Sequence, residues 1–212
     1  MSKIFFGLAL IAGTTLAMAV EEPAYAVIRK LDDVEIRQYA PYVVAELTVD
    51  AAADKAASQA FPVLAAYIFG NNKGGTKLAM TAPVIQASVP GPVELATPAA
   101  SRSAADSHLV RFVLPKGVSP ESAPVPIDQR IRLRDVAPVL VAVIVYSGTW
   151  SASNYQEHLD KLKVVLADAG LAWKGEPVYA RYNPPFTPWF MRRNEIWLTL
   201  ASIEDPLQAR IN

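Results

Sequence analysis

The sequence predicts an α+β protein in which two duplicated strand–strand–helix–strand units pair into a sheet or a distorted barrel, with both helices packed outside it. Short runs of β-branched and aromatic residues, separated by turn-forming residues, indicate strands. Two longer stretches carry apolar residues at helical spacing. One strand motif occurs twice, and each copy is followed by a helix and more strand, so we expect the chain to use one unit twice.

The first unit is expected to contain three strands, a helix and a further strand, over residues 25–31, 34–39, 42–49, 51–69 and 82–89 in that order. Pro62 interrupts the helical stretch, so the helix is either kinked there or begins nearby. Gly70 is expected to end it.

The second unit is expected to contain strands over residues 108–114, 131–136, 139–146, 177–182 and 195–200. Ser153 and Gln156 form a capping box that predicts the start of a helix, and Gly170 predicts its end. The apolar face of this helix consists of Tyr155, Leu159, Leu162, Leu166 and Ala169.

The repeated motif covers residues 34–45 and 131–142, which lie 97 positions apart and are identical at five of twelve positions. Both copies contain a central Ala-Pro break, which favours a true repeat over chance similarity between two hairpins. The repeats then span about 25–89 and 108–200, joined by a Pro-, Ala- and Ser-rich linker over 90–107 that we expect to be flexible. The cleft expected between the two halves is a natural place for a ligand.

The N-terminus has the pattern of a secretory signal peptide over residues 1–19, with a basic start, an apolar run and an Ala-x-Ala end. A buried helix or a membrane anchor is the alternative, but Glu21 and Glu22 end the run before it is long enough to span a bilayer. We therefore expect cleavage after Ala19, a mature domain over 20–212 and export to the periplasm or the medium. No stable membrane insertion is expected after cleavage.

Composition and motifs exclude several classes of function. The mature chain would carry 19 basic and 20 acidic side chains, a balance that gives no reason to expect a nucleic-acid partner. The absence of cysteine excludes thiolate catalysis, cysteine-ligated zinc and covalent haem attachment through cysteines. The sequence also lacks the G-x-S-x-G and H-E-x-x-H motifs of common hydrolases.

Two loops have unusual compositions. Residues 70–77 place Lys73 and Lys77 among Gly and Asn without the order of a phosphate-binding loop, so a flexible turn is favoured over pairing of the lysines with ligand carboxylates. Residues 182–193 combine three prolines with four large apolar side chains, which either cap the core or line a ligand site. Arg192 and Arg193, next to them, could bind carboxylates.

The chain has two histidines. His158 lies at the edge of the apolar face of the second helix, where a half-buried packing role is favoured over the alternative, an axial ligand to haem iron. His108 borders the linker and is expected to be solvated.

Five segments, spread over nearly all of residues 25–200, are conspicuous, namely VEIRQYAPYVVAE, AFPVLAAYIFGNNKGGTKLAMTAPVIQ, VRFVLPKG, VAVIVYSGTW and ARYNPPFTPWFMRRNEIWLTL. These segments closely resemble the SOUL haem-binding protein family, and KLAMTAPV and ARYNPPFTPWFMRRNE are the specific motifs. The resemblance implies a distorted β-barrel flanked by two helices and built by internal duplication. It also implies reversible, non-covalent binding of haem or a related porphyrin.

The resemblance places the ligand on the first helix and on the loop between the last two strands. The apolar residues implied are Phe61, Leu64, Ala65, Ile68, Pro185, Phe186, Trp189, Phe190 and Met191. The basic candidates for the propionates are Lys73, Lys77 and Arg192. An axial histidine of some animal members lies in the first strand motif, where this chain has none. Met80 could ligate iron through its sulfur, although a packed core methionine is favoured.

The predicted function is non-enzymatic binding of haem or a related tetrapyrrole in an apolar pocket, for storage, buffering or delivery outside the cytoplasm. The alternative is a general binding or sensing module for apolar small molecules, because the duplicated architecture resembles the drug-binding domains of bacterial regulators. An enzyme of tetrapyrrole metabolism is least expected, since the sequence offers no assembled acid–base or nucleophile set.

Overall fold

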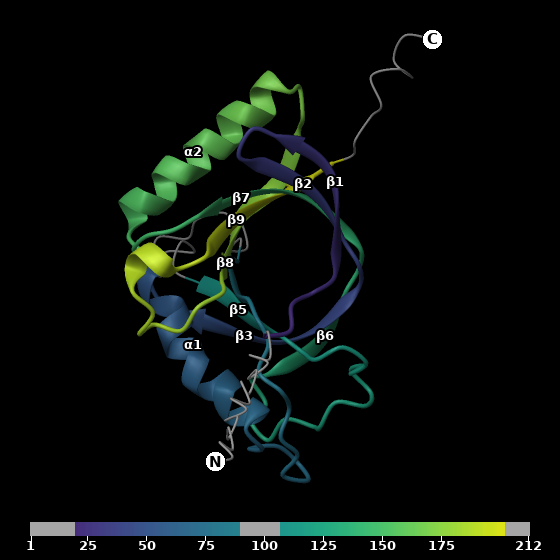
Figure 1. The fold of residues 1–212 in the computed structure, drawn as a ribbon. Coiled ribbons are helices and arrows are strands. Elements are labelled where there is room, and N and C mark those ends of the chain that lie inside the picture. Colours follow the sequence, from purple (N-terminus) through teal and green to yellow (C-terminus); the bar gives the residue numbers. More distant parts are fainter. Residues whose placement is uncertain (1–19, 90–106, 202–212) are drawn as a thin grey trace, which may run out of the picture.

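Strands with alternating buried side chains form a single antiparallel sheet of nine strands, which curls around its own inner face (Figure 1). The computed structural model describes residues 20–89 and 107–201. The predicted signal peptide, and the predicted linker except Ser107, lie outside these residues. Within the described ranges, neither α-helix is long and apolar enough to cross a membrane.

The elements in chain order are β1 (Tyr25–Leu31), β2 (Val34–Tyr39), β3 (Tyr42–Asp50), α1 (Ala53–Ile68), β4 (Val84–Ser88), β5 (Ser107–Val113), β6 (Arg132–Val136), β7 (Val139–Tyr146), α2 (Ala152–Asp168), β8 (Trp173–Arg181), the short 3-10 helix η2 (Trp189–Met191) and β9 (Asn194–Leu200). These bounds confirm the predicted strands and helices to within a few residues. The largest difference is β8, which begins at Trp173 because its N-terminal end also pairs with β9.

The strands pair in the order β1-β2-β7-β9-β8-β4-β5-β3-β6. Because β1 and β6 are the two ends of this order, the predicted barrel is a strongly curled half-barrel. The strand predicted over 108–114 was assigned to the second unit, but it is β5, which pairs with β3 and β4. β5 therefore lies beside the strands of the first unit, because strand pairing joins segments on either side of residues 90–106.

Both helices lie on the outer face of the curl (Figure 1). α1 continues through Pro62 and ends before Gly70, which has a φ of +107°. The start of α2 was predicted wrongly: Ser151 is its N-cap, and its hydroxyl accepts a hydrogen bond from the backbone N–H of Asn154. Ser153 is already helical, so it lacks the extended backbone of a cap.

Three buried apolar clusters hold the sheet and helices together. α1 packs through Leu64 and Tyr67 on a cluster from β3 and β5, and α2 packs through Leu162 and Leu166 on a cluster from β2, β7 and β9. A third cluster, which includes Trp197, fills the inner face of the curl. Each helix therefore covers its own part of the outer face, and a strip of this face lies between the two covered parts.

Candidate functional site

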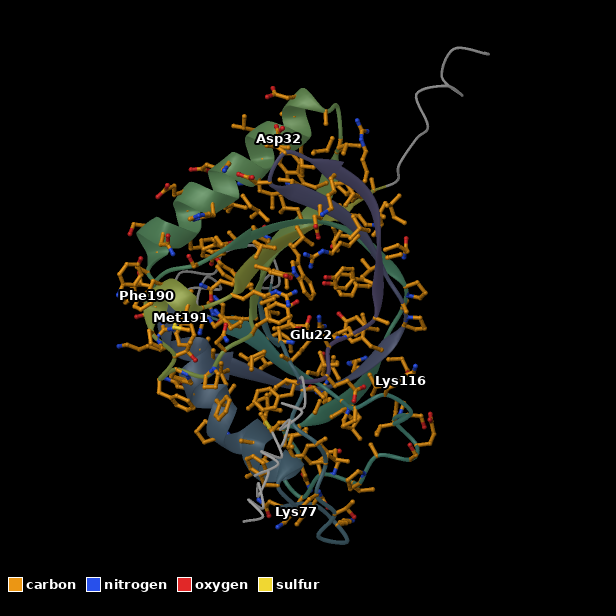
Figure 2. The ribbon with its side chains drawn as sticks, viewed as in Figure 1. Glu22, Asp32, Lys77, Lys116, Phe190 and Met191 are labelled. Carbon is orange, nitrogen blue, oxygen red and sulfur yellow. The ribbon has the colours of Figure 1, made fainter. Side chains whose placement is uncertain are left out.

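The loop that joins β8 to β9, residues 182–193, carries the most exposed aromatic side chains of the described structure. We call it the aromatic loop. Phe186 is 87% exposed, Trp189 57%, Phe190 62% and Met191 66%. Figure 2 shows Phe190 and Met191 at the surface, and in Figure 1 η2 lies between the two helices. These side chains therefore do not cap the core, and an exposed apolar group of this size indicates a binding surface.

Polar contacts hold the aromatic loop in its shape. Arg192 Nε donates to the carbonyl of Thr187 at 2.8 Å, and its Nη2 donates to the carbonyl of Pro185 at 2.7 Å. The backbone N–H of Gly148 donates to the carbonyl of Trp189 at 2.9 Å, which ties η2 to the connection between β7 and α2. The loop is thus presented by hydrogen bonds, and its apolar side chains remain available to a ligand.

A row of side chains crosses the outer face of the sheet between the two helix-covered clusters. Val84 lies opposite Phe112 on one side and Arg181 on the other, and Asn194 lies opposite both Arg181 and Tyr146. Residues directly opposite in an antiparallel sheet point to the same face. We call this strip, centred on β4 and β8, the seam.

Each helix sends one aromatic ring toward the seam. Phe61 of α1 meets Phe112 edge to face, with ring centroids 5.3 Å apart. Tyr155 of α2 stacks on Tyr179 of β8, with centroids 3.7 Å apart. Tyr179 is two residues before Arg181 and therefore lies on the same face of β8.

Two arginines stack on one indole at the edge of the seam. The Cζ atom of Arg181 lies 4.7 Å from the ring centroid of Trp150, and that of Arg192 lies 4.2 Å away. Trp150 is itself held by a 2.8 Å hydrogen bond from its Nε1 to Asn194 Oδ1. Burial lowers the pKa of Arg181, and the neighbouring charge of Arg192 acts in the same direction. An anion bound here would relieve this repulsion.

Two polar atoms beside Tyr179 are buried without a hydrogen-bond partner among the residues described. They are Gln86 Oε1 and the hydroxyl of Tyr155. Gln86 is the cross-strand neighbour of Tyr179, and Tyr155 stacks on its ring. Buried polar groups normally have a partner. The seam therefore offers an acceptor and a hydroxyl beside Tyr179, which is two residues before Arg181.

Three of the predicted apolar site residues on α1 face the core. Leu64, Ala65 and Ile68 are 0%, 8% and 1% exposed and belong to the cluster beneath the helix. Only Phe61, 38% exposed, is available at the surface. Helical spacing of apolar residues identifies the face that packs on the sheet, and this is why the prediction selected core residues.

The predicted Lys77 lies far from the aromatic loop. Figure 2 shows Lys77 at the opposite end of α1 from Phe190 and Met191. The segment with Lys73 is organised by the buried side chain of Asn72, which donates to the carbonyls of Tyr67 and Thr76. The structure therefore joins Arg192, but not Lys77, to the aromatic loop. Sequence reasoning missed Arg181, although a cation directly after the short apolar run 177–180 was a usable signal.

The structure also shows the surroundings of His158 and Met80, the two candidate iron ligands, and of His108. His158 is half-buried; its ring stacks on Tyr146 with centroids 4.3 Å apart, and its Nδ1 lies 2.7 Å from the carbonyl of Asn154. Met80 is 36% exposed and lies outside the three clusters, so it is not a packed core methionine. His108, expected to be solvated, is 3% exposed with Nδ1 2.9 Å from the carbonyl of Ala51.

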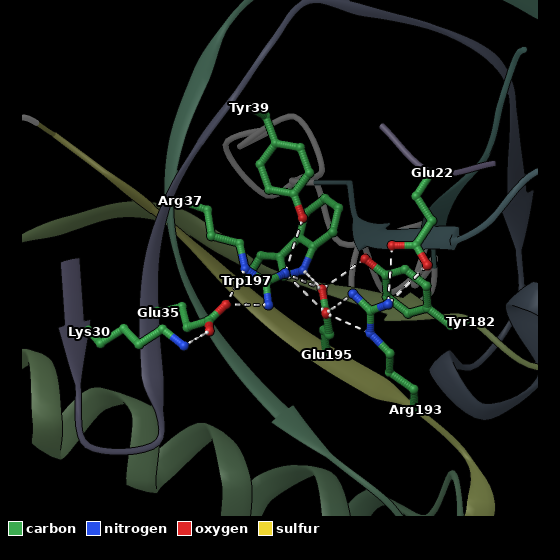
Figure 3. Close-up of polar contacts among 9 residues, drawn as sticks. All are labelled: Glu22, Lys30, Glu35, Arg37, Tyr39, Tyr182, Arg193, Glu195 and Trp197. Atoms are coloured by element: carbon green, nitrogen blue, oxygen red, sulfur yellow. Dashed lines mark hydrogen bonds and ion pairs between the residues drawn. The ribbon is translucent and has the colours of Figure 1, made fainter. Parts of the chain in front are cut away.

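A buried ionic network inside the curl supports the base of the aromatic loop (Figure 3). The fully buried carboxylate of Glu195 accepts hydrogen bonds from Arg37 at 3.0 Å, Arg193 at 2.7 Å, Tyr182 at 2.9 Å and Trp197 at 2.7 Å. Burial opposes the charges of Arg37 and Arg193, but the carboxylate outweighs it and raises both pKa values. Because its oxygens already have these partners, we assign the carboxylate a structural role.

Comparison with known proteins agrees with the sequence motifs. Residues 20–199 match the SOUL heme-binding protein family. Heme-binding protein 1 of Mus musculus is 28% identical over 161 residues, which cover 76% of this chain and 79% of that protein. Heme-binding protein 2 of Homo sapiens is 30% identical over 166 residues, which cover 77% of this chain and 76% of that protein.

Similar folds occur in solved structures of much lower identity. The C-terminal domain of EcmrR is 10% identical, with a TM-score of 0.57, and the match covers 84% of this chain and 99% of that domain. A hydrolase encoded by lin2189 from Listeria innocua is 11% identical, with a TM-score of 0.58, covering 80% of this chain and 92% of that one. These likenesses concern the fold alone, an α+β half-barrel with two helices. By its sequence, the chain belongs to the SOUL heme-binding protein family.

Proposed function

We propose that this protein binds haem or a related tetrapyrrole, without covalent attachment and without turnover, on the aromatic loop and the adjoining seam. The observation that carries the proposal is the exposed aromatic loop beside the stacked Arg181 and Arg192. A tetrapyrrole combines a flat apolar ring with carboxylates, so it matches both parts of this surface. The names of the related heme-binding proteins support the same ligand class.

The binding energy would come mainly from burial of apolar surface. Trp189 and Phe190 are held with their rings more than half exposed, so a planar ligand could cover them without unfolding the loop. Each square ångström of apolar surface removed from water contributes about 25 cal/mol before the costs of association. The guanidinium groups would orient the ligand by binding its carboxylates.

We further propose that the protein acts outside the cytoplasm, in storage, buffering or delivery of the ligand. The signal-type pattern over residues 1–19 supports export. We also propose that the two halves of the sheet derive from one duplicated unit. In support, the first strand of each motif copy pairs with the second strand of the other copy: β2 pairs with β7, and β6 pairs with β3.

Titration of haem and of a metal-free porphyrin into the mature protein tests the proposal. We expect a Soret shift at micromolar protein, and an affinity at least about fivefold lower for Trp189→Ala, since the lost aromatic contact is worth about 1–3 kcal/mol. Phe69→Ala is the matched control, because Phe69 is also 57% exposed but lies at the C-terminal end of α1.

A wild-type protein that leaves both spectra unchanged would contradict tetrapyrrole binding. Competition by an amphipathic cation would instead support the alternative, a general module for apolar small molecules, because two arginines should repel a cationic ligand. Spectroscopic turnover of the bound porphyrin would support the enzyme alternative.

A further inference from the structure

We propose that Arg181, assisted by Arg192 on the same indole, is the receptor for a ligand carboxylate, and that the protein therefore selects tetrapyrroles with free acid groups over their neutral esters. The inference rests on the proposed function and names the acid-binding part of the same site. It replaces the lysines of the 70–77 loop as the expected partners of the propionates.

Arg181 differs from the other strand arginines that are shielded from water, Arg37 and Arg111, each of which has an ion pair. Arg37 pairs with Glu195, and Arg111 and Arg134 share Glu46. Arg181 is also partly buried, yet it forms no ion pair with any residue that the structure describes. A partly buried cation without a counter-charge is costly unless an anion comes to it.

Two like charges lie on the same indole ring. Both guanidinium groups stack on Trp150, at 4.7 and 4.2 Å from its ring centroid, and Trp150 is fixed by Asn194. Two nitrogens of Arg192 already donate hydrogen bonds to carbonyls of its own loop. The guanidinium group of Arg181 donates no hydrogen bond to a described residue. The planar fork of Arg181 thus keeps its capacity for bidentate contact with a carboxylate.

Two buried polar groups beside Tyr179, which is two residues before Arg181, can also serve a ligand. The hydroxyl of Tyr155 makes no hydrogen bond of standard geometry with a described residue. Burial raises its pKa, and the neighbouring Tyr179 hydroxyl acts in the same direction, so it stays protonated and able to donate. Gln86 Oε1, on the strand opposite Tyr179, is a buried acceptor without a described partner. A carboxylate would take the hydroxyl donor, while a ligand N–H or a water molecule would suit the acceptor.

The experiment compares one dicarboxylic porphyrin with its dimethyl ester on four proteins. We expect the wild type to bind the diacid at least about tenfold more tightly than the ester, as expected for one charge-assisted contact of about 1.5–3 kcal/mol. Arg181→Met should lose this preference while its ester affinity is retained, and Arg181→Lys should keep part of it. Lys77→Met, which removes the same charge at the far end of α1, should behave as the wild type.

Each result separates this inference from the proposed function. Failure of the wild type to bind either compound overturns the proposed function. Equal binding of diacid and ester by the wild type, which needs no variant to fold, overturns the acid receptor alone. A preference that survives in Arg181→Met but is lost in Lys77→Met assigns the carboxylate to the lysine loop instead. Near-ultraviolet circular dichroism checks that the variants keep the native packing.

Discussion

Glu195 shows how one buried charge can organise two distant parts of the chain. Its carboxylate binds Arg37 from β2 and Arg193 at the end of the aromatic loop, and Arg193 also reaches Glu22 at 2.9 Å. The sequence contains no local signal for this network, because Arg37 and Glu195 are 158 positions apart. Only the pairing of β2 with β7, and of β7 with β9, brings them together.

Replacing Glu195 with Gln keeps the shape of the side chain but removes the charge that balances Arg37, whose side chain is 3% exposed. Because a buried charge left without its partner costs about 3–5 kcal/mol, we expect the free energy of unfolding to fall by about 3 kcal/mol in urea denaturation. Asp128→Asn, which removes the carboxylate of the exposed pair with Arg130, is the control and should change stability much less. Equal losses in both variants would refute the role of Glu195.

Among the proposed ligand residues, the sequence identified Arg192 and missed Arg181. Arg192 lies inside the ARYNPPFTPWFMRRNE motif, next to the apolar residues that drew attention to it. Arg181 lies in the same motif, but its position on the outer face depends on the register of β8 against β4 and β9. The stacking of Arg181 on Trp150 also depends on the connection between β7 and α2, which carries Trp150. No local sequence pattern predicts this contact.

At the scale of elements, the aromatic loop depends on the connection between β7 and α2. Gly148 has a φ of +117° and donates its N–H to the carbonyl of Trp189. A Cβ atom at this position would lie 2.6 Å from Nδ2 of Asn154, which donates to the carbonyls of Ser147 and Thr149. A side chain at this position would have to displace the hydrogen-bonded amide of Asn154 and adopt a positive φ.

Gly148→Ala should therefore lower both stability and ligand affinity. We expect a loss of about 1–2 kcal/mol from the left-handed backbone, together with weaker porphyrin binding because Asn154 and the aromatic loop must shift. Gly117→Ala separates the two effects: its φ is +84°, but a Cβ atom there meets nothing within 4 Å. It should show the backbone cost in thermal unfolding and keep the porphyrin affinity. Unchanged affinity in Gly148→Ala would show that this anchor is dispensable.

At the scale of the whole molecule, packing on both faces of the sheet surrounds most of the tyrosines. Seven of the eight tyrosines have pKa values raised by burial, namely Tyr39, Tyr42, Tyr67, Tyr146, Tyr155, Tyr179 and Tyr182. For Tyr146 the value is about 12. Folding therefore keeps protons on phenols that would lose them near pH 10 in the unfolded chain.

This protonation makes the fold sensitive to alkali. As the pH rises above about 10, the unfolded chain releases phenolic protons that the folded chain retains, so the free energy of unfolding falls through the range from pH 10 to 12. We expect tyrosinate absorbance of the native protein to rise later than that of the urea-unfolded protein, and then to rise steeply with loss of circular dichroism. Superimposable titration curves would contradict burial of these rings.

The sequence by itself determined the strands, the helices, the family and the aromatic loop, because hydrophobic periodicity, proline and glycine positions and family motifs are properties of contiguous residues. The tertiary structure alone decided that β5 joins the first half of the sheet, that Leu64 faces the core and that Lys77 lies far from the aromatic loop. It also decided that Arg181 meets Trp150. The physical reason is strand register, which sets the neighbours and the face of each side chain through pairing with segments that local sequence does not specify.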